Sequence, residues 1–139
     1  MNILIIGAAG MVGRKLTDAL VASGTLAGKP IEALTLVDVI EPEMPQMDGV
    51  DLTTRAIDID DPSAAETLIA ERPDVIFHLA AIVSGEAELD FEKGYAINLD
   101  GTRYLFEAIR QVGKSEPYCP RFVFTSSIAV FGAPFPDKI

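Results

Sequence analysis

Residues Met1–Gly13, with the sequence MNILIIGAAGMVG, decide the fold of this chain. Ile3–Ile6 is a short, entirely apolar run, which is typical of a strand buried on both faces. Glycines follow it at once, and after Gly13 the spacing of Leu16 and Leu20 predicts a helix. Strand, glycine turn and helix in direct succession form the context in which a glycine pattern has physical meaning.

The three glycines of the turn each have a separate physical role. Gly7 permits the tight turn, Gly10 lets a pyrophosphate approach the backbone, and Gly13 lets the helix pack closely on the strand. The free N–H groups at the start of the helix then face the phosphates. A strand–turn–helix corner can also use glycines for packing alone, so the pattern leaves both interpretations open.

An acidic residue at the end of the second strand favours the nucleotide interpretation. The apolar run at residues 31–37 ends in Asp38, 25 residues after Gly13. An acid there is the usual partner of an adenosine ribose 2′-OH, although Asp also ends strands in ordinary turns. Beside a 2′-phosphate Asp38 would be repelled by up to a few kcal/mol at ~4 Å. The sequence therefore predicts dinucleotide binding, with NAD rather than NADP.

Composition excludes several classes of partner. The 139 residues predict one domain, and 11 basic against 21 acidic residues give a net charge of −10. With no basic stripe, binding of nucleic acid or of anionic membranes is disfavoured. The apolar N-terminal run stops at Arg14, short of the ~20 residues of a membrane span. The lone Cys119 excludes an internal disulfide framework and fits a reducing compartment, so we expect a cytoplasmic protein.

The rest of the chain predicts an α/β fold with a doubly wound parallel sheet. Strands alternating with helices imply a parallel sheet that is covered on both faces, with right-handed crossovers. Strands are expected at residues 52–59, 75–81 and 121–125, and helices at 61–71 and 95–112 with Gly113 as the C′ residue. Residues 84–93 form a mixed connecting segment whose acidic residues read as a solvated face.

Ligands of such sheets bind outside the carboxyl ends of the strands. The groups expected there are Gly7–Gly13, Asp38, Asp58-Ile59, Leu79–Val83 and Ser126-Ser127. The two serine hydroxyls fit either hydrogen bonding to a reacting substrate oxygen or capping of the strand end, with equal weight. His78, inside an apolar strand, is favoured as a satisfied structural residue over a general base. Without clustered Cys and His, no metal site is expected.

Six motifs together resemble the extended short-chain dehydrogenase/reductase family, in the family's order and along the whole chain. They are GAAGMVG (7–13), Asp38, Asp58-Ile59, HLAA (78–81), NLDGT (98–102) and FTSSIAVFG (124–132). The resemblance implies a Rossmann domain, here with about five strands, that is followed in the family by a smaller substrate domain.

The resemblance also assigns roles by position. Gly7, Gly10, Met11, Val12 and Gly13 would hold the pyrophosphate, Asp38 the adenosine ribose, and Asp58 with Ile59 the adenine. Leu79, Ala80 and Ala81 would line the path to the nicotinamide, Asn98 would support the site, and Thr125 joins the cofactor-binding residues. Ser127 matches the catalytic Ser/Thr, while Ser126 and the Ser84-Gly85 turn are candidates for substrate binding. The Ser84-Gly85 turn fits a helix-leading turn equally well.

One departure from the family is the absence of its Tyr-x-x-x-Lys general base. Tyr95, Tyr104 and Tyr118 lie upstream of Ser127, and none is followed by Lys at the fourth position. Ser127 would then polarise a hydroxyl with nothing beside it to take the proton. We therefore expect residues 1–139 to be the NAD-binding Rossmann domain from the N-terminal part of a longer enzyme, inactive alone.

Resemblance narrows the expected reaction but leaves alternatives. Within the family, HLAAIVSGEAE and FTSSIAVFGAPFPD are similar to members that oxidise the 2-hydroxyl of a four-carbon sugar acid such as D-erythronate, with a small hydroxy acid as substrate. A nucleotide-sugar epimerase or dehydratase shares every cofactor motif. A non-catalytic NAD-sensing module is the alternative of another class. Family members are commonly dimers, so a homodimer through the helix at 95–112 is expected from resemblance alone.

Overall fold

The computed structural model describes residues 1–132, and the APFPD motif at 133–137 lies outside them. Five parallel strands form one sheet in the order β5-β4-β1-β6-β7, which confirms the predicted fold class. β1 is central, and the chain crosses to opposite sides of it, which creates the switch point where ligands bind in such folds. The strands are β1 (Asn2–Ile6), β4 (Ala33–Asp38), β5 (Asp51–Ala56), β6 (Val75–His78) and β7 (Arg121–Phe124).

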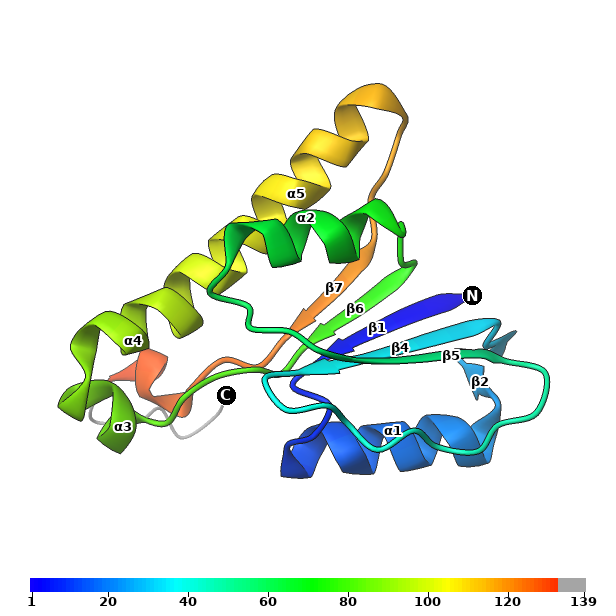
Figure 1. Ribbon diagram of the computed structural model, residues 1–139, viewed down its shortest axis with the longest axis horizontal. Helices are drawn as coiled ribbons and strands as arrows, with labels where there is room; N and C mark the ends of the chain where they lie inside the picture. Colours follow the sequence, from blue (N-terminus) through cyan, green and yellow to red (C-terminus); the bar gives the residue numbers. More distant parts are fainter. Residues whose placement is uncertain (133–139) are drawn as a thin grey trace.

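Helices cover both faces of the sheet. α1 lies on one face, while α2 and α5 lie together on the other (Figure 1). The helices are α1 (Met11–Ser23), α2 (Pro62–Ala70), α3 (Ser84–Leu89), α4 (Phe91–Tyr95) and α5 (Gly101–Ser115). A π-helical turn (Ala96–Asp100) joins α4 to α5, and a 3-10 turn (Ile128–Phe131) follows β7. None of the helices among residues 1–132 has both the length and the apolar character that a membrane span requires.

β1 divides its side chains between two cores. Ile3 and Ile5 pack with Leu34 in the core beneath α1, whereas Leu4 and Ile6 pack in the core beneath α2 and α5. All four β1 side chains are at most 2% exposed, so the strand is buried on both faces as predicted. Burial of each such side chain stabilises the fold by about 1.5–3 kcal/mol. These cores fix the position of the turn that follows β1.

The start of α2 follows the capping signal in the sequence. The Asp61 carboxylate accepts the N–H of Ser63 at 2.9 Å, and Pro62 occupies the first helical turn. The cap satisfies a donor that the helix leaves unpaired, and proline needs no partner there. The predicted helix start is therefore confirmed.

Several predicted boundaries are wrong. The third strand ends at Ala56 rather than residue 59, and the fourth at His78 rather than residue 81. The last bond of the ladder between β6 and β1 runs from Leu79 N to Ile6 O, because β1 gives way to the turn at Gly7 and offers the next residues no further strand to pair with.

The other corrections concern helices and a turn. Gly113 lies inside α5, which continues to Ser115 because extended Glu116 precedes the proline that stops it. Residues 84–93 contain α3 and part of α4. A short hairpin, β2 (Thr25–Leu26) with β3 (Lys29–Pro30), was not expected.

Candidate functional site

The glycine turn after β1 is built by close backbone contacts. Gly7 has φ +91°, and a Cβ there would lie 2.6 Å from Ala80 N. The Gly7 and Ala8 N–H groups both donate to Val37 O, at 2.8 and 3.0 Å. A side chain at position 7 would therefore collide with the segment that follows β6, as the tight-turn role of this glycine requires.

Gly13 and Gly10 differ in what surrounds them. A Cβ at Gly13 would lie 2.1 Å from Gly7 O and 2.6 Å from Ala8 Cα, so α1 can approach the turn only with glycine there. A Cβ at Gly10 would meet only Gly7 O, at 3.3 Å, and Gly10 is exposed. The packing interpretation thus accounts for Gly13, while the space above Gly10 is open to a ligand.

Asp38 joins the end of β4 to the glycine turn. Its Oδ2 accepts the N–H of Ala9 at 2.9 Å, and its Oδ1 accepts the N–H of Val39 at 2.8 Å. Each carboxylate oxygen has a second lone pair, so both can accept a further hydrogen bond from a hydroxyl. The carboxylate is half-buried and lies at the carboxyl edge of the sheet, where the sequence places it.

A cavity of about 500 Å³ opens at this edge of the sheet. Its volume is within the range of small-molecule and cofactor sites. The structure brings together eight of the predicted residues around it: Gly7, Gly10, Asp38, Asp58, Ile59, Leu79, Ala80 and Ala81. Ile82, from the expected Leu79–Val83 group, also lines the cavity, and apolar side chains that the sequence did not place there complete the wall: Ile6, Val39, Ile40, Ile57 and Ile97.

The other predicted cofactor residues lie around the cavity rather than on its wall. Met11 and Val12 open α1 and are 68% and 53% exposed, with Gly13 buried beneath them. The N-cap residue, Gly10, has no side chain that could accept a hydrogen bond from the first N–H groups of α1. Such a helix start attracts anions, above all phosphates.

A larger cavity of about 780 Å³ lies at the opposite edge of the sheet. It is lined by residues at the amino ends of β6 and β7, among them Asp74 and Arg121, and by the β2–β3 hairpin. Parallel sheets place their ligands at the carboxyl ends, and no residue of the glycine turn after β1 lines this cavity. The smaller cavity is therefore the candidate site.

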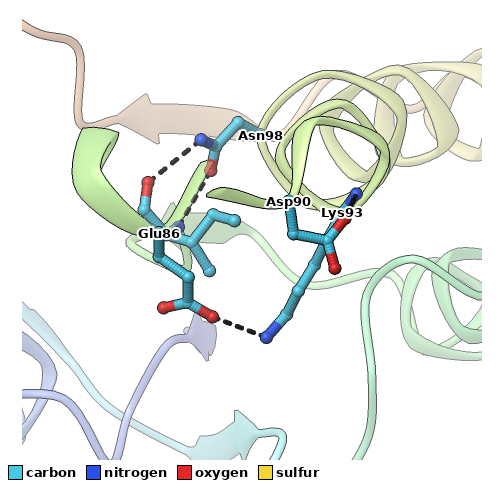
Figure 2. A network of polar contacts seen from close by, with 5 residues as sticks. Glu86, Asp90, Lys93 and Asn98 are labelled. Carbon is cyan, nitrogen blue, oxygen red and sulfur yellow. Dashed lines mark hydrogen bonds and ion pairs between the residues drawn. The ribbon is translucent and has the colours of Figure 1, made fainter. Parts of the chain in front are cut away.

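Asn98 supports the cavity indirectly. Its Oδ1 accepts the N–H of Ile82 at 2.9 Å, and its Nδ2 donates to Ile82 O at 3.0 Å (Figure 2). This pair of hydrogen bonds fixes a wall residue of the cavity to the π-helical turn. The supporting role of Asn98 in cofactor binding stays a prediction.

Besides Asn98 and the three residues of α1, five further candidate residues lie outside the cavity wall: Ser84, Gly85, Thr125, Ser126 and Ser127. Ser84 begins α3 directly after its N-cap Val83. Ser127 caps the 3-10 turn, because its Oγ accepts the N–H of Ala129 at 3.2 Å. Ser127 therefore caps the 3-10 turn rather than the end of β7, and its hydroxyl hydrogen is still free to donate. Thr125 bonds to His78 O at the end of β6.

His78 is a buried residue beneath the site. It is 1% exposed, and its Nε2 lies 2.9 Å from Thr102 Oγ1. Among residues 1–132, no partner is present for its Nδ1, so the expectation of a fully satisfied histidine is only half right. Burial lowers the pKa of His78 to about 4, which keeps the ring neutral at pH 7. A buried neutral ring on a strand has a structural role here.

Two charged wall residues were missed by sequence reasoning. Glu86 was assigned to a solvated segment and Lys93 to no role, yet both line the cavity. Their side chains form an ion pair with Nζ 2.6 Å from Oε1 (Figure 2). The available signal was Asp90, whose carboxylate caps α4 by accepting the N–H of Lys93 at 3.0 Å. A helix recognised there would have turned Lys93 into a candidate.

The cavity fits an adenine dinucleotide in chemistry as well as in size. It offers open space above Gly10, an uncapped helix start for phosphates, and a carboxylate at Asp38 for ribose hydroxyls. The apolar wall suits a flat base.

Comparison with known proteins agrees with this assignment. D-erythronate dehydrogenase of Cupriavidus necator is 41% identical over 143 residues, and that of Haemophilus influenzae is 37% identical over 139. Each comparison covers 100% of this chain and 42% of the relative, so the chain spans less than half their length.

A solved structure, the nucleoside-diphosphate-sugar epimerase of Agrobacterium tumefaciens, has 65% identity and a TM-score of 0.93, over 98% of this chain and 40% of that one. The profile of the NAD dependent epimerase/dehydratase family matches residues 3–138. This confirms the resemblance and the predicted cofactor, NAD. The chain therefore belongs to the NAD dependent epimerase/dehydratase family.

Proposed function

We propose that residues 1–139 are the NAD-binding domain of a cytoplasmic oxidoreductase that oxidises a hydroxyl of a small sugar acid. D-erythronate, oxidised from the 2-hydroxyl to the 2-keto acid, is the proposed substrate. The observation that carries the proposal is the cavity at the carboxyl ends of the strands, which gathers eight residues expected to bind NAD. The choice of substrate draws on the names of the two curated relatives.

Backbone and carboxylate groups would hold NAD in this cavity. The N–H groups at the start of α1 and the open backbone at Gly10 would bind the diphosphate. Asp38 would accept hydrogen bonds from ribose hydroxyls through the lone pairs that its backbone partners leave free. Asp58 and Ile59 would border the adenine. Bound NAD supplies a hydride acceptor, which no amino-acid side chain provides.

The substrate would lie toward the end of β7. The hydroxyl hydrogen of Ser127 would donate to the reacting oxygen while its Oγ continues to accept the N–H of Ala129. Ser126 and the first two residues of α3, Ser84 and Gly85, are proposed to hold the substrate carboxylate, and Thr125 to border the nicotinamide. Removal of the substrate proton requires a base that none of these residues provides.

A nucleotide-sugar epimerase or dehydratase is the second candidate. The solved structure at 65% identity carries the name nucleoside-diphosphate-sugar epimerase, which favours this alternative. The named relatives are enzymes, which disfavours the sensing-module alternative.

A homodimer is also proposed. Leu99 and Phe106 are 54% and 52% exposed, and their spacing of seven puts them on one side of the segment that α5 continues. Sedimentation of the full chain should give twice the monomer mass. A strictly monomeric chain at micromolar concentration would contradict it.

Gly10 provides the sharpest test of the cofactor site. Gly10→Ala should weaken NAD binding at least about tenfold, because a methyl group would fill the space left for the diphosphate. Calorimetric titration measures the affinity, thermal unfolding checks that the fold is kept, and adenosine is the matched ligand without phosphate. Unchanged NAD affinity in the variant would refute the assigned diphosphate position.

Substrate is tested by NADH formation with the full-length enzyme to which residues 1–139 belong, because we expect these residues alone to be inactive. The proposal expects turnover with D-erythronate within a panel of small aldonic and hydroxy acids. Inactivity toward the whole panel, together with turnover of UDP-sugars, would select the second candidate instead.

A further inference from the structure

The charges on the cavity wall are unbalanced. Asp38, Asp58 and Glu86 are acidic, and Lys93 is the one basic side chain among the residues that line the cavity. A dinucleotide adds two negative charges through its diphosphate. The three carboxylates of the wall therefore repel the phosphates of the proposed ligand, whereas Lys93 and the backbone N–H groups of α1 attract them.

Lys93 is held at the cavity by an acidic partner. Its Nζ lies 2.6 Å from Glu86 Oε1, and the two side chains extend toward each other from α4 and α3 (Figure 2). The hydrogen bond to Glu86 and the nearby carboxylates of Glu86, Asp90 and Asp58 raise the pKa of Lys93, so the ammonium stays charged at neutral pH. The cavity thus contains a permanent positive charge.

The fold does not depend on the Lys93–Glu86 ion pair. Both side chains are about half exposed, at 48% and 49%, and exposed ion pairs stabilise proteins weakly. α4 is fixed by other contacts: Asp90 caps its first turn, and Gly94 packs so closely that a Cβ would lie 2.9 Å from Ala87 Cβ. The flexible lysine stem can therefore move to a new partner while the helix keeps its place.

We propose that Lys93 binds the diphosphate of the dinucleotide and that Glu86 holds the ammonium at the cavity until the ligand arrives. On binding, the ammonium exchanges the carboxylate of Glu86 for a phosphate oxygen, which forms a charge-assisted hydrogen bond. This role rests on the proposed function, because it assumes that the cavity binds NAD. It adds a side-chain contact to a phosphate site otherwise built from backbone.

Two variants of the pair and one control test the proposal. Lys93→Gln removes the charge, Glu86→Gln frees it, and Lys114→Gln removes a lysine of α5 that contacts Gln111 and does not line the cavity. Each is titrated calorimetrically in the full chain with NAD, ADP-ribose and adenosine, at low and high salt. Thermal unfolding without ligand reports on any structural effect.

The two ligand classes should respond differently. Lys93→Gln should weaken NAD and ADP-ribose about tenfold at low salt and less at high salt, as expected for loss of one charge-assisted bond. Adenosine, without phosphate, should bind within about twofold of the wild type. Lys93→Arg should restore most of the affinity, and Lys114→Gln should change none of it. Glu86→Gln should tighten NAD a few-fold, since it removes a repelling charge and a competitor.

Three results would overturn the role of Lys93. They are unchanged NAD affinity in Lys93→Gln, an equal loss for adenosine and ADP-ribose, and weaker NAD binding in Glu86→Gln. Absence of NAD binding by the wild type would overturn the proposed function and this role with it. Wild-type binding combined with an unaffected Lys93→Gln variant would leave the proposed function intact.

Discussion

The glycine turn and the α3–α4 segment border the same cavity but are built in opposite ways. The turn is fixed by buried backbone contacts in which Gly7 and Gly13 leave no room for a Cβ. The α3–α4 segment is exposed, has a single buried residue, Gly94, and contributes its charges through long side chains. One wall of the site is therefore set by packing and the other by polar contacts.

The two walls meet two different requirements of a binding site: a backbone that is fixed before binding and side chains that can rearrange. Packed backbone keeps the phosphate-binding N–H groups in place before a ligand arrives, so little ordering is left to be done on binding. Exposed polar contacts can rearrange without cost to the core. Substitutions should therefore affect stability on the first wall and mainly affinity on the second.

Gly13→Ala should have the largest effect, because it breaks the packed wall. Its Cβ would strike backbone atoms of the turn, and we expect a loss of at least about 3 kcal/mol in the free energy of unfolding. Urea denaturation measures it. The control is Gly85→Ala in α3, where no atom lies within 4 Å of the new Cβ and alanine favours the helix. Equal stability of the two variants would remove the distinction between the walls.

The pH dependence of stability should report on His78, which joins β6 to α5 through Thr102. Its pKa of about 4 in the folded chain lies below the value of about 6.5 expected when unfolded, so the unfolded chain takes up the proton first. Its contribution is complete above pH 6.5 and is lost as pH falls toward 4, by about 3 kcal/mol in total.

The measurement is the free energy of unfolding from pH 7 to pH 4 for the wild type and for His78→Phe. Titration of the other acidic groups is common to both proteins, so the difference between the two curves isolates the imidazole. The wild type should lose more stability than the variant over this interval. Parallel curves would show that His78 is not buried in its neutral form.

Asn98→Ala changes the polar wall and should have the smallest effect on the free energy of unfolding. It removes both hydrogen bonds to Ile82, at an exposed site, and we expect about 1 kcal/mol of destabilisation. Hydrogen exchange at the Ile82 amide should accelerate more than exchange in β1. Asn98→Asp keeps the acceptor for that amide and should retain much of its protection. Uniform acceleration across the sheet would mean that the two walls unfold together.

Sequence reasoning succeeded where burial or backbone geometry allows only a few residue types at a position. The apolar run of β1, the three glycines and Asp38 gave the sheet, the turn and the candidate site, because burial on both faces and close approach allow few residue types. The cap at Asp61 and Pro62 located the start of α2 for the same reason.

It failed where the outcome depends on neighbours in space. β6 ends at His78 because β1 turns away, which the apolar letters of HLAA do not reveal. Lys93 and Glu86 meet across two short helices whose exposed residues carry no strong apolar period. Likewise, that His78 Nδ1 has no hydrogen-bond partner within residues 1–132 depends on what surrounds the ring in space, and its own strand does not reveal it.

The two backbone partners of Asp38 bear on any attempt to re-engineer coenzyme preference. Acceptance of NADP would call for removal of the negative charge at this position, yet both oxygens already accept N–H groups, from Ala9 and Val39. Asparagine would turn one acceptor into a donor facing an N–H, and alanine would leave both donors without a partner. A designer would therefore have to rebuild the loop before altering the specificity.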